Sequence, residues 1–145
     1  MQLDDFISIP DQGRVVDAIG DAEKMTSGEI RVHVTPKCGS DVMREAAKVF
    51  NRLEMYKTRH RNGVLIYVAF ESRKFAILGD AGINKVVPEN FWENEKDVLL
   101  EYLKQNDPAT GLCKVIASVG EKLKEYFPIE EDDENELSNE ISFES

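Results

Sequence analysis

An unbroken run of apolar residues, Val64 to Phe70, constrains the fold of this chain most strongly. A strand that is exposed on one face alternates between apolar and polar residues, so an unbroken run predicts a strand covered on both faces. Residues 29–35 do alternate, with Ile30, Val32 and Val34 on one face. The sequence therefore predicts a sheet in which a fully buried strand lies near a half-buried one.

Helical periodicity separates these two strands. A cap at Ser40 and an apolar stripe behind it predict a helix that ends near residue 55. A strand, a helix and a second strand in this order predict a right-handed crossover between parallel strands. The apolar run from Lys74 to Leu78 follows after a short turn, which predicts an antiparallel hairpin partner.

Three further helices complete the pattern. They are expected at residues 9–26, from Pro88 onward, and from the Asp107-Pro108 start signal to about Phe127. The whole order is α-β-α-β-β-α-α. This order predicts a small three-layer α/β/α sandwich with a mixed sheet, built from one parallel crossover and one β-hairpin.

The charge of the 145-residue chain is concentrated near its C-terminus. Eight of the 28 Asp and Glu residues, and none of the 18 Lys and Arg residues, lie from Pro128 onward. The formal charge of −10 therefore divides into −2 for residues 1–127 and −8 for residues 128–145. We expect residues 1–127 to form one domain and residues 128–145 to be a disordered acidic tail. A chain this acidic lacks the cationic face that non-specific nucleic-acid binding requires.

Signals for targeting and cross-linking are absent from the sequence. No apolar run approaches the roughly 18 residues of a membrane span. The acidic N-terminus lacks the charged and then apolar plan of a signal peptide. Two cysteines, Cys38 and Cys113, are too few for a disulfide scaffold. We expect a cytoplasmic monomer with no membrane partner.

The expected topology gathers oxygen-bearing side chains at one end of the sheet. Both parallel strands would start at this end, and the antiparallel third strand would finish there. Carboxylate and amide oxygens on loops are the donors that Ca²⁺, and also Mg²⁺, take in proteins. The candidate metal ligands are Asp80, Glu29, Glu89, Asn84 and the backbone at Gly82, and the candidate anion-binding residues are Arg61 and Asn62.

Each candidate also has a purely structural interpretation. Asp80 can hydrogen-bond within its own turn, and Glu89 can complement the dipole of the following helix. Glu29 can lie on a solvated strand face. The basic residues 59–61 can form a solvated loop instead of an anion site.

Three segments of the chain resemble the TPM domain family: TSGEIRV at residues 26–32, RNGVLI at residues 61–66 and RKFAILGDAGI at residues 73–83. The family includes plant thylakoid-lumen proteins linked to photosystem II repair and membrane-anchored bacterial relatives. The resemblance covers residues 8–127 and is greatest to short single-domain bacterial members. It implies a Rossmann-like sandwich, binding of divalent metal, calcium especially, and in some relatives acid phosphatase activity.

The glycine-rich turn departs from the usual pattern of the family. An extra residue separates Gly79 from Gly82, Asn84 stands at the position of an acid, and Glu89 stands at that of a later Asp. The lost carboxylate weakens the implied catalysis more than the implied metal binding. Asp80, inside the turn, offers a replacement charge.

Three functions remain open at this point. The first is a calcium-binding TPM-type domain of regulatory or binding character, and the second is a metal-dependent acid phosphatase with Arg61 as the anion partner. The third is a protein-interaction module that uses the strand edge or the tail. A separate phosphatase pattern, Cys38-x5-Arg44, lacks a glycine at its centre, and Arg44 falls inside an expected helix.

Overall fold

The computed structural model describes residues 2–130 and 138–144. None of the helices in these two ranges is long and apolar enough to cross a membrane. In chain order the elements are α1 (Leu3–Phe6), α2 (Ile9–Glu23), β1 (Glu29–Thr35), α3 (Val42–Arg52), β2 (Gly63–Ala69), β3 (Lys74–Gly79), α4 (Ala81–Asn84), α5 (Phe91–Lys104), α6 (Pro108–Tyr126) and β4 (Ser142–Phe143).

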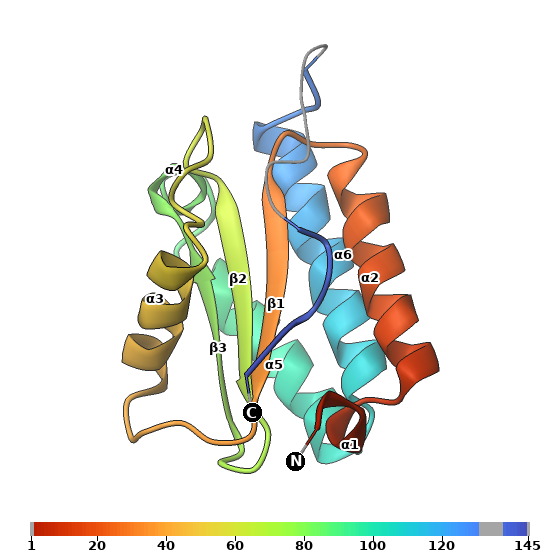
Figure 1. Cartoon of the computed structure of the whole chain (residues 1–145). Coiled ribbons are helices and arrows are strands. Elements are labelled where there is room, and N and C mark those ends of the chain that lie inside the picture. The colour runs from red at the N-terminus through yellow and green to blue at the C-terminus, as the bar shows by residue number, and fades with distance from the viewer. Residues whose placement is uncertain (1, 131–137, 145) are drawn as a thin grey trace.

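The strands form one mixed sheet in the order β3-β2-β1-β4 (Figure 1). β1 and β2 run parallel, with Glu29 opposite Gly63 and Thr35 opposite Ala69. β3 returns antiparallel to β2. The expected crossover and hairpin are both confirmed.

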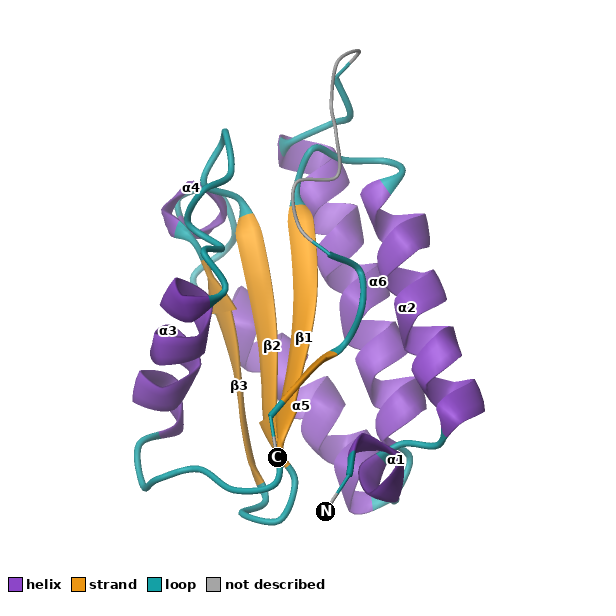
Figure 2. Cartoon of the chain, in the orientation of Figure 1, coloured by secondary structure: helices purple, strands orange, loops and turns teal. Residues whose placement is uncertain are grey.

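Helices cover both faces of the sheet, as the three-layer expectation requires. α3 lies on one face, and α2, α5 and α6 lie on the other (Figure 2). β2 contributes to the core on both sides: Val64 and Ile66 pack in the cluster beneath α2, α5 and α6, whereas Leu65 and Tyr67 pack against α3. Burial on both faces explains why this strand is apolar at every position.

Side-chain caps fix the starts of α2, α3 and α6, whereas α5 begins without a side-chain cap. The Ser8 side chain accepts a hydrogen bond from the Asp11 N–H at the start of α2, and Asp107 does the same for Thr110 at the start of α6. The cap of α3 is Asp41 instead of the expected Ser40. α2 ends at Glu23, three residues before the expected residue 26, and Lys24 is its C-cap.

The C-terminal segment, residues 138–144, differs from the expected disorder. Ser142–Phe143 form β4, which lies parallel to β1 opposite His33 and Val34. The physical reason is the pair of apolar side chains, Ile141 and Phe143, which pack against the large core cluster. Residues 131–137, on which the same expectation falls, lie outside the described residues.

Candidate functional site

The starts of β1 and β2 lie at the same end of the sheet as the end of β3 (the upper end in Figure 1). Glu29 is opposite Gly63 in the β1–β2 ladder. The Asp80 N–H donates to the Gly63 carbonyl at 2.9 Å. The structure thus brings together the three segments that the topology argument placed there.

Asp80 is held by an ion pair and by its own helix. Arg61 donates to both carboxylate oxygens, from Nε at 2.7 Å and from a terminal nitrogen at 2.8 Å. The Ala81 N–H donates to Asp80 Oδ1 at 2.7 Å, so Asp80 is also the N-cap of α4. The hydrogen bond to Asp80 raises the pKa of the Arg61 guanidinium. Asp80 therefore hydrogen-bonds within its own turn, as its structural interpretation expects. The guanidinium of Arg61 is already paired with a carboxylate of the chain itself.

Asn84 and Gly82 fix the shape of this end of the molecule. Asn84 donates from Nδ2 to the Gly79 carbonyl at 2.8 Å and accepts from Trp92 Nε1 at 2.9 Å. The Gly82 N–H donates to the Arg61 carbonyl at 2.7 Å. A Cβ at position 82 would come within 2.6 Å of that carbonyl oxygen, so the close approach of two backbones requires glycine.

Glu29 forms a carboxyl pair with Glu23. The residue is only 2% exposed, so the solvated-face interpretation of Glu29 is wrong. Glu23, the last residue of α2, accepts from the Ile30 N–H at 2.8 Å. Burial and the neighbouring charge of Glu29 raise the pKa of Glu23 to about 9, although the bond from Ile30 opposes the shift. The pair therefore holds a proton at neutral pH.

Glu23 is a site residue that the sequence reasoning did not identify. It stands six positions before Glu29, near the end of a helix, and no motif contains it. Its role depends on the packing of the last turn of α2 beside the edge of β1. The available signal was the position of an acid at the C-terminal end of a helix, where the dipole disfavours negative charge.

Asn62 is buried beside the start of β1. It is 1% exposed, and its backbone carbonyl accepts from the Glu29 N–H at 3.4 Å. Its side chain donates to Ser27 Oγ at 3.4 Å. Among the described residues, neither Asn62 Oδ1 nor Glu23 Oε1 has a hydrogen-bond partner, although both atoms are buried. Asn62 Oδ1 is thus an oxygen that could bind a hard cation at this sheet end, whereas the Glu23 carboxyl already interacts with Glu29.

Glu89 is exposed in the turn between α4 and α5. Within the described ranges, no three side chains of His, Cys, Asp and Glu are grouped so that they could hold a metal ion. The candidate ligands therefore share one end of the fold without forming a ready-made cage. Cys38 and Cys113 are both free thiols, and Arg44 lies within α3.

The fold is a small α/β sandwich with a mixed sheet, and its polar end is formed where β1 and β2 begin and β3 ends. A family model described as the TPM domain matches residues 1–122, and the chain belongs to this family. Comparison with curated proteins gives no match.

The solved structures that are similar to this chain include the following two. The NMR structure of BA42 protein from the psychrophilic bacterium Bizionia argentinensis has 43% sequence identity and a TM-score of 0.90, and the match covers 99% of each chain. The N-terminal domain of the cg2496 protein from Corynebacterium glutamicum has 19% identity and a TM-score of 0.64 over 81% of this chain and 74% of that one. The second likeness concerns the fold alone.

Proposed function

We propose that this chain is a calcium-binding TPM domain of regulatory or binding character, with its site at the end of the sheet where β1 and β2 begin. The observation that carries the proposal is the Glu23–Glu29 carboxyl pair, in which Glu29 is buried and Glu23 is half-buried. The raised pKa of Glu23 keeps a proton on the pair at neutral pH. A divalent cation can replace such a proton, because it satisfies two neighbouring carboxylates at once.

The donor chemistry of this end fits a hard cation. Glu23 and Glu29 would supply carboxylate oxygens, and Asn62 Oδ1 would supply an amide oxygen that has no hydrogen-bond partner within the described part of the chain. Ca²⁺ accepts irregular sets of oxygen ligands, whereas Mg²⁺ requires a near-ideal octahedron. The donors here come from a helix end, a strand start and a loop, which favours Ca²⁺.

Asp80 takes a secondary place in this proposal. Both of its carboxylate oxygens already accept hydrogen bonds from Arg61. Direct ligation by Asp80 would require the release of that guanidinium. We therefore propose Glu29 as the principal ligand. Asp80 helps to fix the shape of the site and adds negative charge near it.

Calcium titration of the full chain, followed by backbone NMR shifts, tests the proposal. Shifts are expected at Glu23, Glu29 and Asn62, and Glu29→Gln should abolish them at calcium concentrations that saturate the wild type. Glu45→Gln, an acid-to-amide change on α3, is the matched control and should leave the titration unchanged. Asp80→Asn should weaken binding less than Glu29→Gln does.

Proton release gives a second measurement. If one proton leaves the pair when Ca²⁺ binds, the dissociation constant for Ca²⁺ should fall as the pH rises from 6 to 8, by up to about tenfold per pH unit. Calorimetry in buffers of different ionisation enthalpy measures the released proton. Shifts confined to residues 128–145, or no shifts at millimolar Ca²⁺, would contradict the assignment.

The acid phosphatase alternative has no observation of its own in its favour. Arg61, the expected partner of the phosphoryl group, is bound to Asp80 on both carboxylate oxygens. A turnover assay on para-nitrophenyl phosphate with wild type and Asp80→Asn would separate the two functions, because only a phosphatase at this site would lose activity in the variant.

A further inference from the structure

The edge of β1 binds an extended segment of the same chain. β4 lies beside β1 with Ser142 opposite His33 and Phe143 opposite Val34. The Glu144 N–H donates to the Val34 carbonyl at 3.0 Å. This is the geometry of peptide recognition by strand addition, in which main-chain bonds hold the peptide and alternate side chains enter different surroundings.

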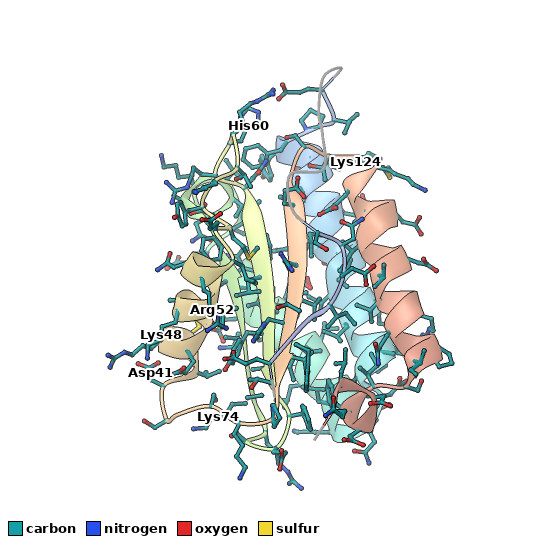
Figure 3. The ribbon with its side chains drawn as sticks, viewed as in Figure 1. Asp41, Lys48, Arg52, His60, Lys74 and Lys124 are labelled. Carbon is teal, nitrogen blue, oxygen red and sulfur yellow. The ribbon has the colours of Figure 1, made fainter. Side chains whose placement is uncertain are left out.

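The side chains of this segment separate by face. Ile141 and Phe143 pack against the apolar core. Ser142 Oγ lies 2.9 Å from His33 Nδ1. Glu144 accepts from Arg52 at 2.7 Å, and Arg52, labelled in Figure 3, is the last residue of α3. One face of the edge thus takes apolar side chains, and the other takes a hydroxyl and an acid.

The polar face carries donors that the segment does not saturate. Arg31 Nε is buried and makes no hydrogen bond to any described residue. His33 is 2% exposed, and its Nε2 lies 3.4 Å from Glu144 Oε1, beyond ordinary hydrogen-bond distance. Burial lowers the pKa of His33, and the guanidinium groups of Arg31 and Arg52 both lie near enough to lower it further, so this side of the edge carries two positive charges. Their natural complement is a segment with more than one acid.

The chain's own segment uses only part of the available edge. β1 has seven residues, but β4 pairs with only two of them. If the ladder continued two residues further in the same register, residue 140 would lie opposite Arg31. Instead, β4 begins at Ser142, and the Glu140 N–H donates to Ser138 Oγ in a local turn. A peptide without the connection to α6 is free to complete this pairing.

We propose that the β1 edge is a binding site for an extended acidic segment of a partner protein, with the order acid, apolar, hydroxyl, aromatic, acid. Residues 140–144 of this chain have that order, and residues 142–144 occupy part of the site in cis. A second copy is the less favourable occupant. Its segment has the same connection to α6 that keeps Glu140 out of the pairing with β1, so it cannot complete the ladder either.

The test uses a fluorescent peptide that spans residues 138–144 and ends in an amide. The receptors are the full wild-type chain and the full Phe143→Ala/Glu144→Lys variant. In this variant the internal segment loses the apolar contact of Phe143, and the lysine at position 144 repels Arg52. Anisotropy should show at least about tenfold tighter binding to the variant, because its site no longer has an effective tethered competitor. A Glu140→Gln peptide should bind the variant more weakly, and a scrambled peptide should not bind.

Several results would overturn the proposal. These are equal affinity of the two receptors, equal affinity for the scrambled peptide, or no binding at about 1 mM peptide. Should the variant fail to fold, the wild type gives the answer: excess peptide must shift the NMR signals of Val34, Ser142 and Phe143, and unchanged signals contradict the site. Sedimentation of the wild type as a dimer with exchanged segments would identify a second copy as the occupant, against the proposal.

Discussion

A side chain at position 82 would collide with the loop that precedes β2. A Cβ there would lie within 2.6 Å of the Arg61 carbonyl oxygen, which is backbone and cannot rotate away. We expect Gly82→Ala to lower the free energy of unfolding by about 1–3 kcal/mol, as overpacking does elsewhere. Urea denaturation measures the change.

The matched control for this substitution is Gly13→Ala in α2. A Cβ at position 13 would meet nothing within 4 Å. Alanine has the higher helix propensity, so this variant should gain up to about 1 kcal/mol. Loss of stability in both variants to the same degree would show that steric contact at Gly82 is not the cause.

The Glu23–Glu29 pair makes stability depend on pH. The pKa of Glu23 is raised to about 9 in the folded state, chiefly by burial, and in the unfolded chain it returns to its ordinary value near 4.5. Between these two values the folded state holds the extra proton, so stability falls as pH rises through this window, by at most about 1.4 kcal/mol per pH unit.

Glu23→Gln should flatten this dependence, because the amide cannot titrate. Thermal or urea unfolding of wild type and variant at several pH values between 5 and 9 measures it. Asp17→Asn, an exposed acid on the same helix, is the control and should keep the wild-type slope. A variant slope equal to that of the wild type would locate the titrating group elsewhere.

At the scale of elements, α6 depends on its N-terminal cap. Asp107 accepts from the Thr110 N–H, and α6 contributes eight buried residues to the core. We expect Asp107→Ala to cost about 1 kcal/mol of stability, since a buried helix loses a partner for one of its first N–H groups. Asp97→Ala, on the exposed side of α5, should change stability by less than about 0.5 kcal/mol. Equal effects in a denaturation series would contradict the capping role.

The long elements could be predicted because each has a full period of apolar residues. Val64–Phe70 indicates a strand buried on both faces, and the alternation of Ile30, Val32 and Val34 locates its neighbour β1. The expectation that this neighbour is half-buried is wrong, because six of the seven residues of β1 are buried. The short elements α1, α4 and β4 have two to four residues, too few for periodicity to identify. Their positions depend on tertiary packing, as the apolar contact of Phe143 shows.

Only the location of the candidate site, and not its side-chain contacts, could be predicted from the topology. Parallel pairing of β1 with β2 brings Glu29 beside Gly63, and the hairpin brings Asp80 back to the same end. The ion pair between Arg61 and Asp80 and the carboxyl neighbour Glu23 were not foreseen. Both depend on side-chain directions at helix and loop ends, which sequence spacing does not determine.

At the scale of the whole molecule, positive charge is segregated. Residues 37–74 hold nine of the 18 Lys and Arg residues but only four of the 28 Asp and Glu residues, in a chain of formal charge −10. Two acids near the C-terminus meet this basic part: Glu130 pairs with Arg59 and His60, and Glu144 pairs with Arg52. These contacts are exposed, so salt should screen them.

We expect the C-terminal segment to loosen when salt is raised from about 0.01 M to 1 M, because the screening length falls from about 30 Å to 3 Å. Hydrogen exchange of the Glu144 amide, which donates to Val34, should accelerate by up to about fivefold, the equivalent of one surface ion pair of about 1 kcal/mol. Arg52→Gln should give the same acceleration at low salt. If neither high salt nor Arg52→Gln changes the exchange rate, electrostatic attraction does not contribute to holding the C-terminal segment.

The contact between the Arg61 carbonyl and Gly82, together with the ion pair between Arg61 and Asp80, also has a consequence for proteolysis. A protease must draw about ten residues of chain into an extended form, and these bonds hold the backbone at Arg61 against α4. Trypsin should therefore nick the loop first after Lys57 or Arg59 and spare the bond after Arg61. Mass spectrometry of the earliest fragments gives the order of cleavage. Early cleavage after Arg61 would show that the loop at Arg61 separates from α4 more easily than their contacts indicate.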